Sequence, residues 1–158
     1  MQKVVTTLWF DGQVQAALDL YASVFEDFAV SDVSRYPDAM PEKAGEIINA
    51  SFSIGGQQFN ILNGGPQFPQ TPAVSLMVNC ENQAEVDRVW DALIADGGEP
   101  GQCGWLKDKF GVSWQVVPMG MSELFTTGTA EQRSRAQQAM LKMSKLDLPA
   151  LQAAHAGE

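Results

Sequence analysis

The chain has one histidine and two cysteines among 158 residues. His155 lies near the end of the sequence, so no Ser-His-Asp or Cys-His catalytic set can be assembled around it. Cys80 and Cys103 are too few for a disulfide framework and too isolated for a zinc motif. A nucleophilic cysteine needs an adjacent base or cation, and Cys103 has only Lys107 nearby in sequence. The sequence therefore identifies no catalytic residue and predicts two reduced cysteines.

Basic residues are also scarce. Ten Lys and Arg against 19 Asp and Glu give a formal net charge of −9 and a pI near 4.4. Nucleic-acid binding needs a basic surface, so nucleic acid is excluded as a partner. Four basic residues follow position 130: Arg133, Arg135, Lys142 and Lys145. They indicate either a solvated helix face or a basic tail that docks on an acidic surface.

The sequence has no long apolar run. No stretch approaches the roughly 20 residues that span a bilayer. The first residues show no basic start followed by a small-residue cleavage site, as a secretory signal would. We therefore expect no membrane partner and a cytoplasmic location. The length is typical of one compact domain with its own core.

What the sequence does contain is an internal repeat. Residues 8–13 and the apolar-periodic run after them are matched by residues 77–82 and a second run. Tyr21 corresponds to Trp90, 69 positions later, and residues 55–61 correspond to 110–116 at a smaller offset. A unit of about 65 residues that occurs twice is too long and too few for a solenoid. The pattern indicates gene duplication.

Each copy predicts a βαβββ module. Alternating β-branched and aromatic runs predict strands, and i, i+3, i+4 apolar spacing predicts helices. The first module, residues 1–66, is predicted as strand 4–10, helix 13–26, strand 28–36 and hairpin 46–54/57–62. The second module, residues 73–118, is predicted as strand 73–79, helix 82–95 and strands 99–103, 105–108 and 113–117. An appendage, residues 119–158, is predicted to hold helices 130–143 and 147–154, the last capped by Asp147 with Pro149 in its first turn.

Two βαβββ modules with these turns resemble the vicinal oxygen chelate superfamily of glyoxalases, extradiol dioxygenases and bleomycin- or fosfomycin-resistance proteins. The sequence is most similar to the PhnB-like branch, which carries the label 3-demethylubiquinone-9 3-methyltransferase. The resemblance is strongest at residues 8–13, 62–66 and 97–111, and residues 138–147 of the tail fit the same branch. It implies an α+β protein of the glyoxalase/bleomycin resistance/dioxygenase fold: two modules forming a cupped mixed sheet, with C-terminal helices, usually as a homodimer.

The resemblance also locates where a metal would bind. In enzymes of this superfamily, His or Glu side chains at matching positions of both modules hold a divalent cation. Those positions correspond here to Val5 (or Val4), Asn60, Val74 and Gln115. Valine donates nothing, and neutral amides are poor ligands for transition metals beside imidazole or carboxylate. We therefore expect no metal and no cofactor, which is unfavourable to glyoxalase, dioxygenase and thiol-transferase chemistry.

The methyltransferase label finds little support in the residues. A donor nucleotide is typically held by a glycine-rich turn between a strand and a helix. The glycine pairs at 55–56, 64–65 and 97–98 are instead placed at hairpin turns and at a helix end, where glycine is the default residue.

The residues support the binding of a small molecule better than they support catalysis. If position 5 faces the cup, strand alternation brings further side chains of both modules to the same face. The predicted pocket lining is Thr7, Trp9, Asn60, Leu62, Leu76, Gln115 and Val117. An apolar lining with a few amides is typical of small-molecule sites. The sequence thus predicts a metal-free protein that binds a small molecule between its modules. One alternative is an enzyme of unrecognised chemistry, including methyl transfer. The other is a dimeric protein with a packed cleft and no ligand.

The C-terminal appendage, residues 119–158 and below called the tail, also indicates how the chain assembles. Ala139, Met140 and Met143 form an apolar stripe on a helix too short to be stable alone. It must dock either on its own acidic body or on a second copy of the chain. Together with the unpaired sheet edges of a duplicated cup, it predicts a homodimer in which the C-terminal helices cover the partner.

Overall fold

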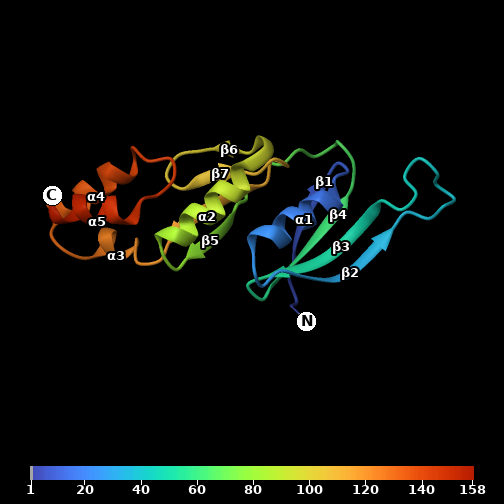
Figure 1. The fold of residues 1–158 in the computed structure, drawn as a ribbon, viewed down its shortest axis with the longest axis horizontal. Helices are drawn as coiled ribbons and strands as arrows, with labels where there is room; N and C mark the ends of the chain where they lie inside the picture. Colours follow the sequence, from blue (N-terminus) through green and yellow to red (C-terminus); the bar gives the residue numbers. More distant parts are fainter. Residues whose placement is uncertain (1) are drawn as a thin grey trace. The chain divides into compact units, whose positions relative to one another are not determined.

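The computed structural model describes residues 2–158, which form two compact units, residues 2–70 and 71–158 (Figure 1). Each unit contains the order strand, helix, three strands, and the second unit continues into helices. The predicted α+β class with C-terminal helices is therefore confirmed. The eight strands are divided into two four-stranded mixed sheets, one in each unit.

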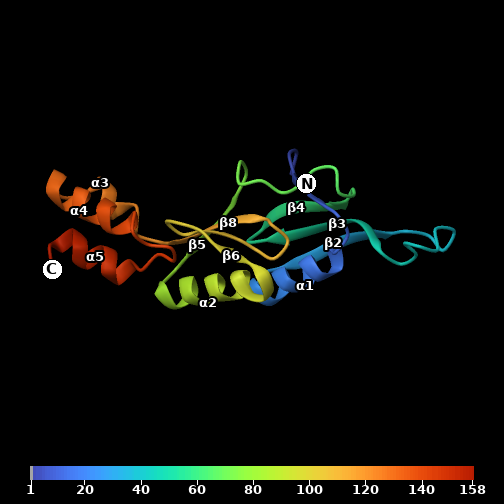
Figure 2. The same cartoon turned by 90° about the horizontal axis from the view of Figure 1, so that it is seen from above.

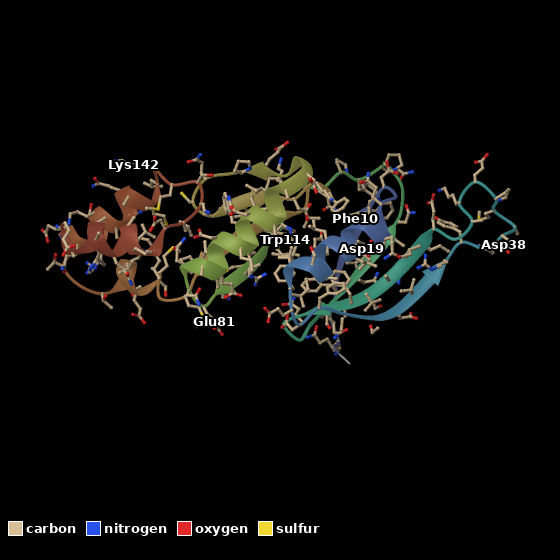
Figure 3. All side chains as sticks on the ribbon, in the orientation of Figure 1. Phe10, Asp19, Asp38, Glu81, Trp114 and Lys142 are labelled. Carbon is tan, nitrogen blue, oxygen red and sulfur yellow. The ribbon has the colours of Figure 1, made fainter. Side chains whose placement is uncertain are left out.

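The first unit is the first βαβββ module. Its elements are β1 (Thr6–Phe10), α1 (Val14–Val24), β2 (Ala29–Arg35), β3 (Ile47–Ile54) and β4 (Gln57–Asn63). The sheet order is β1-β4-β3-β2, with β1 parallel to β4 and the other pairs antiparallel. A loop joins β2 to β3 and carries Asp38 away from the sheet (Figure 3). Strand β2 forms one edge, and all seven of its residues are exposed.

An aromatic cluster holds α1 on one face of this sheet (Figure 2). Phe52 of β3 lies at its centre, 6.1 Å from the Tyr21 ring, 5.3 Å from the Phe59 ring and 5.6 Å from the Phe28 ring, centroid to centroid. The side chain of Phe10 is buried on this face (Figure 3). Burial of such large apolar side chains is the main stabilising contribution to a module of this size.

The second unit repeats the arrangement with shorter strands. Its sheet elements are β5 (Leu76–Cys80), α2 (Gln83–Ile94), the 3-10 turn η1 (Ala95–Gly97), β6 (Glu99–Pro100), β7 (Trp105–Lys107) and β8 (Ser113–Pro118). The order is β5-β8-β7-β6, again with one parallel pair, β5 and β8. Asn82 caps α2, because its side chain accepts a hydrogen bond from the Glu85 N–H. Helix α2 packs on the sheet through Val86, Val89, Trp90 and Leu93.

Asp108 organises the β7–β8 turn. Its side chain is 2% exposed. Its Oδ1 accepts hydrogen bonds from the N–H groups of Phe110 and Val112 at 2.9 and 3.0 Å, and its Oδ2 accepts one from the Trp114 indole at 3.0 Å. A buried carboxylate is stable only when such donors replace its water. This residue therefore fixes both the turn and the Trp114 ring beneath α2 (Figure 3).

Three helices follow the second sheet: α3 (Glu123–Thr126), α4 (Ala130–Met140) and α5 (Leu148–Ala156). The predicted helix 130–143 ends at Met140, before Lys142 (Figure 3), and α3 was not predicted. The Arg135 guanidinium donates to the carbonyls of Ala154 at 3.0 Å and His155 at 2.7 Å. It thus caps the C-terminal end of α5, where a cation is favoured.

The tail docks on its own unit through residues 143–148. The Lys145 ammonium lies 2.9 Å from the Asp87 carboxylate and 3.5 Å from that of Asp91. The hydrogen bond from Lys145 lowers the pKa of Asp87, and the same bond raises the pKa of Lys145. Leu146 is fully buried, and Gln83 hydrogen-bonds both its carbonyl and the Leu148 N–H. Of the two docking surfaces considered for the tail, these contacts use its own acidic body.

Candidate functional site

A cavity of about 690 Å³ lies on the face of the second sheet opposite α2. Strand side chains form its floor, and the segments before α3 and at the end of α4 form its wall. The lining residues are Met77, Asn79, Cys103, Trp105, Gln115, Val117, Pro118, Met119, Gly120, Met121, Ser122 and Met140. Four of the chain's seven methionines are among them. Methionine side chains are flexible and polarisable, which suits a surface that adapts to different apolar ligands.

Backbone hydrogen bonds hold the wall against the floor. The Met119 N–H donates to the Cys80 carbonyl at the end of β5, 2.7 Å away. The Cys103 N–H donates to the Met143 carbonyl at 2.8 Å, and its thiol lies 3.5 Å from the Met140 carbonyl. The wall is therefore positioned by the docked tail.

The strand register corrects one predicted lining residue. Gln115 pairs with Met77 and Val117 with Asn79, so these four share the open face. Leu76 pairs with Trp114, which is 2% exposed on the helix-covered face. The prediction placed Leu76 on the open face by extending the helix offset of 69 into the strand.

The cause of this error is a shorter connection. Three residues separate Phe10, the last of β1, from Val14, the first of α1, whereas two separate Cys80 from Gln83. The strands therefore correspond at an offset of 70, and a shift of one residue turns every side chain to the other face.

The corrected offset changes one of the four positions that correspond to metal ligands. The counterpart of Val5 is Ser75, not Val74, and the Gln115 amide nitrogen donates to the Ser75 hydroxyl at 2.9 Å. In the first module, the Asn60 amide nitrogen donates to the Asn49 side-chain oxygen at 2.7 Å. Neutral groups that already bond one another are a poor set for a divalent transition metal. Within residues 2–158, no three His, Cys, Asp or Glu side chains gather as a metal site would require.

The predicted residues of the first module share the open face of its own sheet. Thr7 pairs with Asn60 and Trp9 with Leu62. The Trp9 indole donates to the Gly65 carbonyl at 2.8 Å, and its ring meets that of Phe68 edge-on at 5.0 Å. A Cβ on Gly64 would lie 2.3 Å from the Trp9 ring, so only glycine allows this approach. The structure thus places Thr7, Trp9, Asn60 and Leu62 on one face of the first sheet, with Thr7 exposed and the other three half-buried.

The two thiols differ in setting. Cys80 is fully buried, and its burial, with a smaller contribution from Glu85, raises its pKa to about 12. It is therefore an unreactive core residue. Cys103 is partly exposed in the cavity and adopts a φ of 56°, a backbone conformation uncommon for residues other than glycine.

Sequence reasoning missed Met77, Asn79, Trp105 and the whole wall. The slip in the β5 register hid the first two. The wall comes after the duplicated modules, so the repeat gave no guide to it. The one available signal was the run Met119-Gly120-Met121, which places two methionines beyond the last strand.

The sequence and fold of this chain are similar to those of known proteins. The family described as 3-demethylubiquinone-9 3-methyltransferase matches residues 2–117. The PhnB protein from Bacillus cereus is 36% identical, with a TM-score of 0.69 over 74% of this chain and 99% of that one. The chain therefore has the glyoxalase/bleomycin resistance fold of the vicinal oxygen chelate superfamily. It belongs to the PhnB-like family described as 3-demethylubiquinone-9 3-methyltransferase.

More distant structures share the fold. PA1353 from Pseudomonas aeruginosa is 22% identical, with a TM-score of 0.62 over 75% of this chain and 98% of that one. The fosfomycin resistance protein FosX from Listeria monocytogenes, solved with Mn(II) and sulfate, is 16% identical, with a TM-score of 0.54 over 73% and 92%. No curated protein matched the sequence. The family match ends at residue 117, so the resemblance of the tail stays a prediction.

No helix within residues 2–158 combines the length and the hydropathy that a membrane span requires.

Proposed function

We propose that this PhnB-like protein binds a small apolar or aromatic molecule without a metal, and that the ligand occupies the methionine-lined cavity of the second module. The observation that carries the proposal is the composition of that cavity. It combines flexible apolar side chains and the Trp105 ring with two amides, Asn79 and Gln115. Ligand sites are typically concave and apolar, with a few polar groups that orient the ligand.

Metal-dependent chemistry does not enter the proposal. FosX was solved with Mn(II), a cation for which carboxylates are suitable protein ligands. The corresponding side chains here are Val5, Asn60, Ser75 and Gln115, which lack both imidazole and carboxylate. Their own hydrogen bonds give the two amides a structural use on the open faces.

Methyl transfer, the activity in the family's description, gains no support from the glycine pairs. Gly55 and Gly56 form the β3–β4 turn, Gly64 and Gly65 follow β4, and residues 97–98 follow α2. None of these pairs joins the end of a strand to the start of a helix. The predicted first-module residues Thr7, Trp9, Asn60 and Leu62 lie on the open face of their own sheet and do not line this cavity.

The binding proposal can be tested with a neutral dye, N-phenyl-1-naphthylamine, whose fluorescence rises in apolar surroundings. We expect saturable binding by the full chain, unchanged by EDTA. Met77→Asp should weaken it about tenfold or more, because an apolar ligand would strip water from the new carboxylate. Met40→Asp is the matched control: Met40 is 52% exposed, beside 55% for Met77, and lines no part of the cavity. Equal losses in both variants, or no saturable binding, would contradict the proposal.

We also propose that the chain is a homodimer. Edge strands with unpaired backbone groups are normally covered, and β2 is such an edge, with Val30 and Val33 43% and 38% exposed. Light scattering at micromolar concentration should give twice the mass of the chain, and Val33→Lys should shift it toward one. A single-chain mass for the unmodified protein would refute this assembly.

A further inference from the structure

A second, smaller cavity of about 210 Å³ lies beside the methionine-lined one. Trp105 lines both cavities, so the two adjoin at this residue. The smaller cavity differs in chemistry, since Lys107, Glu99 and Ser113 contribute to its lining. Two mainly apolar cavities thus meet at Trp105, and the smaller one adds a lysine, a carboxylate and a buried hydroxyl.

The hydroxyl of Ser113 is the unexplained group in the smaller cavity. Ser113 is 3% exposed, and its Oγ has no hydrogen-bond partner among the described residues. A buried hydroxyl without a partner is costly, so such groups call for an explanation. Strand alternation puts Ser113 on the same face as Gln115, roughly 7 Å away along β8. The lone hydroxyl therefore lies next to the floor of the larger cavity.

Lys107 supplies positive charge at the same place. It pairs directly with Ser113 across the β7–β8 ladder, so the two side chains share a face. Its ammonium lies 3.9 Å from the Glu99 carboxylate, and both side chains are substantially exposed, at 45% and 75%. Exposed ion pairs at this distance are weak. The flexible lysine can leave Glu99 for a better anionic partner at little cost.

We infer that Ser113 and Lys107 form an anionic subsite of the proposed ligand site. The ligand class is an amphiphilic acid: an aromatic or apolar body in the methionine-lined cavity, carrying a carboxylate or sulfonate that reaches past Trp105. The Ser113 hydroxyl donates to one oxygen of that group, and the Lys107 ammonium donates to the same group. Because Ser113 is only 3% exposed, the side chains that cover it move aside as the anion enters. The inference rests on the proposed binding function and adds the charge of the ligand.

Two dyes that differ mainly in charge test this subsite. 8-Anilinonaphthalene-1-sulfonate carries a sulfonate, and N-phenyl-1-naphthylamine has the same aromatic body without it. Ser113→Ala should weaken binding of the sulfonate about tenfold, the usual effect of losing a hydrogen bond to a charged group. Binding of the neutral dye should stay within about twofold. Lys107→Met should act in the same direction, with a loss of about threefold to tenfold.

The matched control is Lys109→Met. Lys109 also lies 3.9 Å from a carboxylate, that of Asp96, but does not line either cavity. Lys109→Met removes the same positive charge as Lys107→Met and should leave the binding of both dyes unchanged. Ser113→Ala should also raise the melting temperature of the unliganded chain by about 2–4 °C, because it deletes a buried hydroxyl without a partner. Weaker sulfonate binding together with higher stability is a combination that a structural role of Ser113 would not give.

The outcomes separate the two proposals. If neither dye binds the unmodified chain, the proposed function fails. If the neutral dye binds and Met77→Asp abolishes its binding, the function stands; equal affinities of Ser113→Ala and the unmodified chain for the sulfonate then overturn the subsite. Parallel losses of both dyes in Ser113→Ala would also overturn it, since they would show that the cavity itself is damaged.

Discussion

Asp108→Ala should lower the free energy of unfolding by about 3–5 kcal/mol, a large fraction of the roughly 5–15 kcal/mol of a typical domain. The carboxylate accepts hydrogen bonds from two backbone N–H groups of its own turn and from the Trp114 indole. Alanine would leave all three donors without this acceptor in a region where water does not reach Val112 or Trp114. Urea denaturation followed by tryptophan fluorescence measures the loss.

Asp108→Asn provides the control. An amide oxygen in place of Oδ1 still accepts from Phe110 and Val112, but the amide NH₂ then faces the Trp114 N–H, donor against donor. The destabilisation should be intermediate. Trp114→Phe removes the indole donor, and a double-mutant cycle of Trp114→Phe with Asp108→Ala should show coupling between positions 108 and 114. Additive effects, or an alanine variant as stable as the parent, would show that the carboxylate does not organise the turn.

The same residue links stability to the site. The turn that Asp108 holds joins β7 to β8, and these strands carry Trp105, Ser113 and Gln115. Fixed strand pairing is what brings Trp105 opposite Gln115 on the open face. Sites supported on a rigid pair of strands hold their side chains more precisely than sites on loops. The turn is therefore a supporting element of both cavities, although it lines neither with its carboxylate.

The helices and strands of the two modules could be predicted from the sequence because the hydrophobic periodicity, the helix cap and the turn residues all indicated the same elements. Helix periodicity, the Asn82 cap and the glycine turn at 55–56 all favoured the elements that the structure contains. Leu8 and Phe10 alternate along β1 with the predicted lining residues Thr7 and Trp9 and are 7% and 5% exposed. Short-range signals such as these depend on local backbone physics, which a single sequence expresses directly.

The site was less accessible to prediction. Leu76 was assigned to the wrong face because a repeat aligned on its helices does not reveal a connection that is one residue shorter. Met119, Met121 and Met140 come together only because the tail folds back onto its own unit, and the repeat holds no first copy of that tail. Ser113 looked like an ordinary strand residue, since the lack of a partner for its hydroxyl depends on what surrounds it in three dimensions.

The largest functional effect away from the cavity should come from Leu146→Ala. Leu146 is fully buried, and the approach of its side chain to Gly104 is so close that a Cβ there would lie 2.7 Å from the leucine Cδ1. Removing a buried leucine side chain typically costs about 2–5 kcal/mol. Part of this loss should weaken the docking of the tail on the second sheet. Leu146 lies three residues after Met143, whose carbonyl accepts a hydrogen bond from the Cys103 N–H.

Loosening of the tail should then appear as weaker ligand binding. Met140 belongs to the cavity wall, and it stands six residues before Leu146 in the docked segment. We expect the affinity for N-phenyl-1-naphthylamine to fall about tenfold in Leu146→Ala, with faster amide hydrogen exchange in residues 119–143, since local opening of the tail exposes both. Leu141→Ala is the matched control in the same tail: Leu141 is 59% exposed, so neither stability nor binding should change appreciably. A Leu146→Ala variant that loses stability but binds the dye as tightly as the parent would show that the tail stabilises the fold without shaping the site.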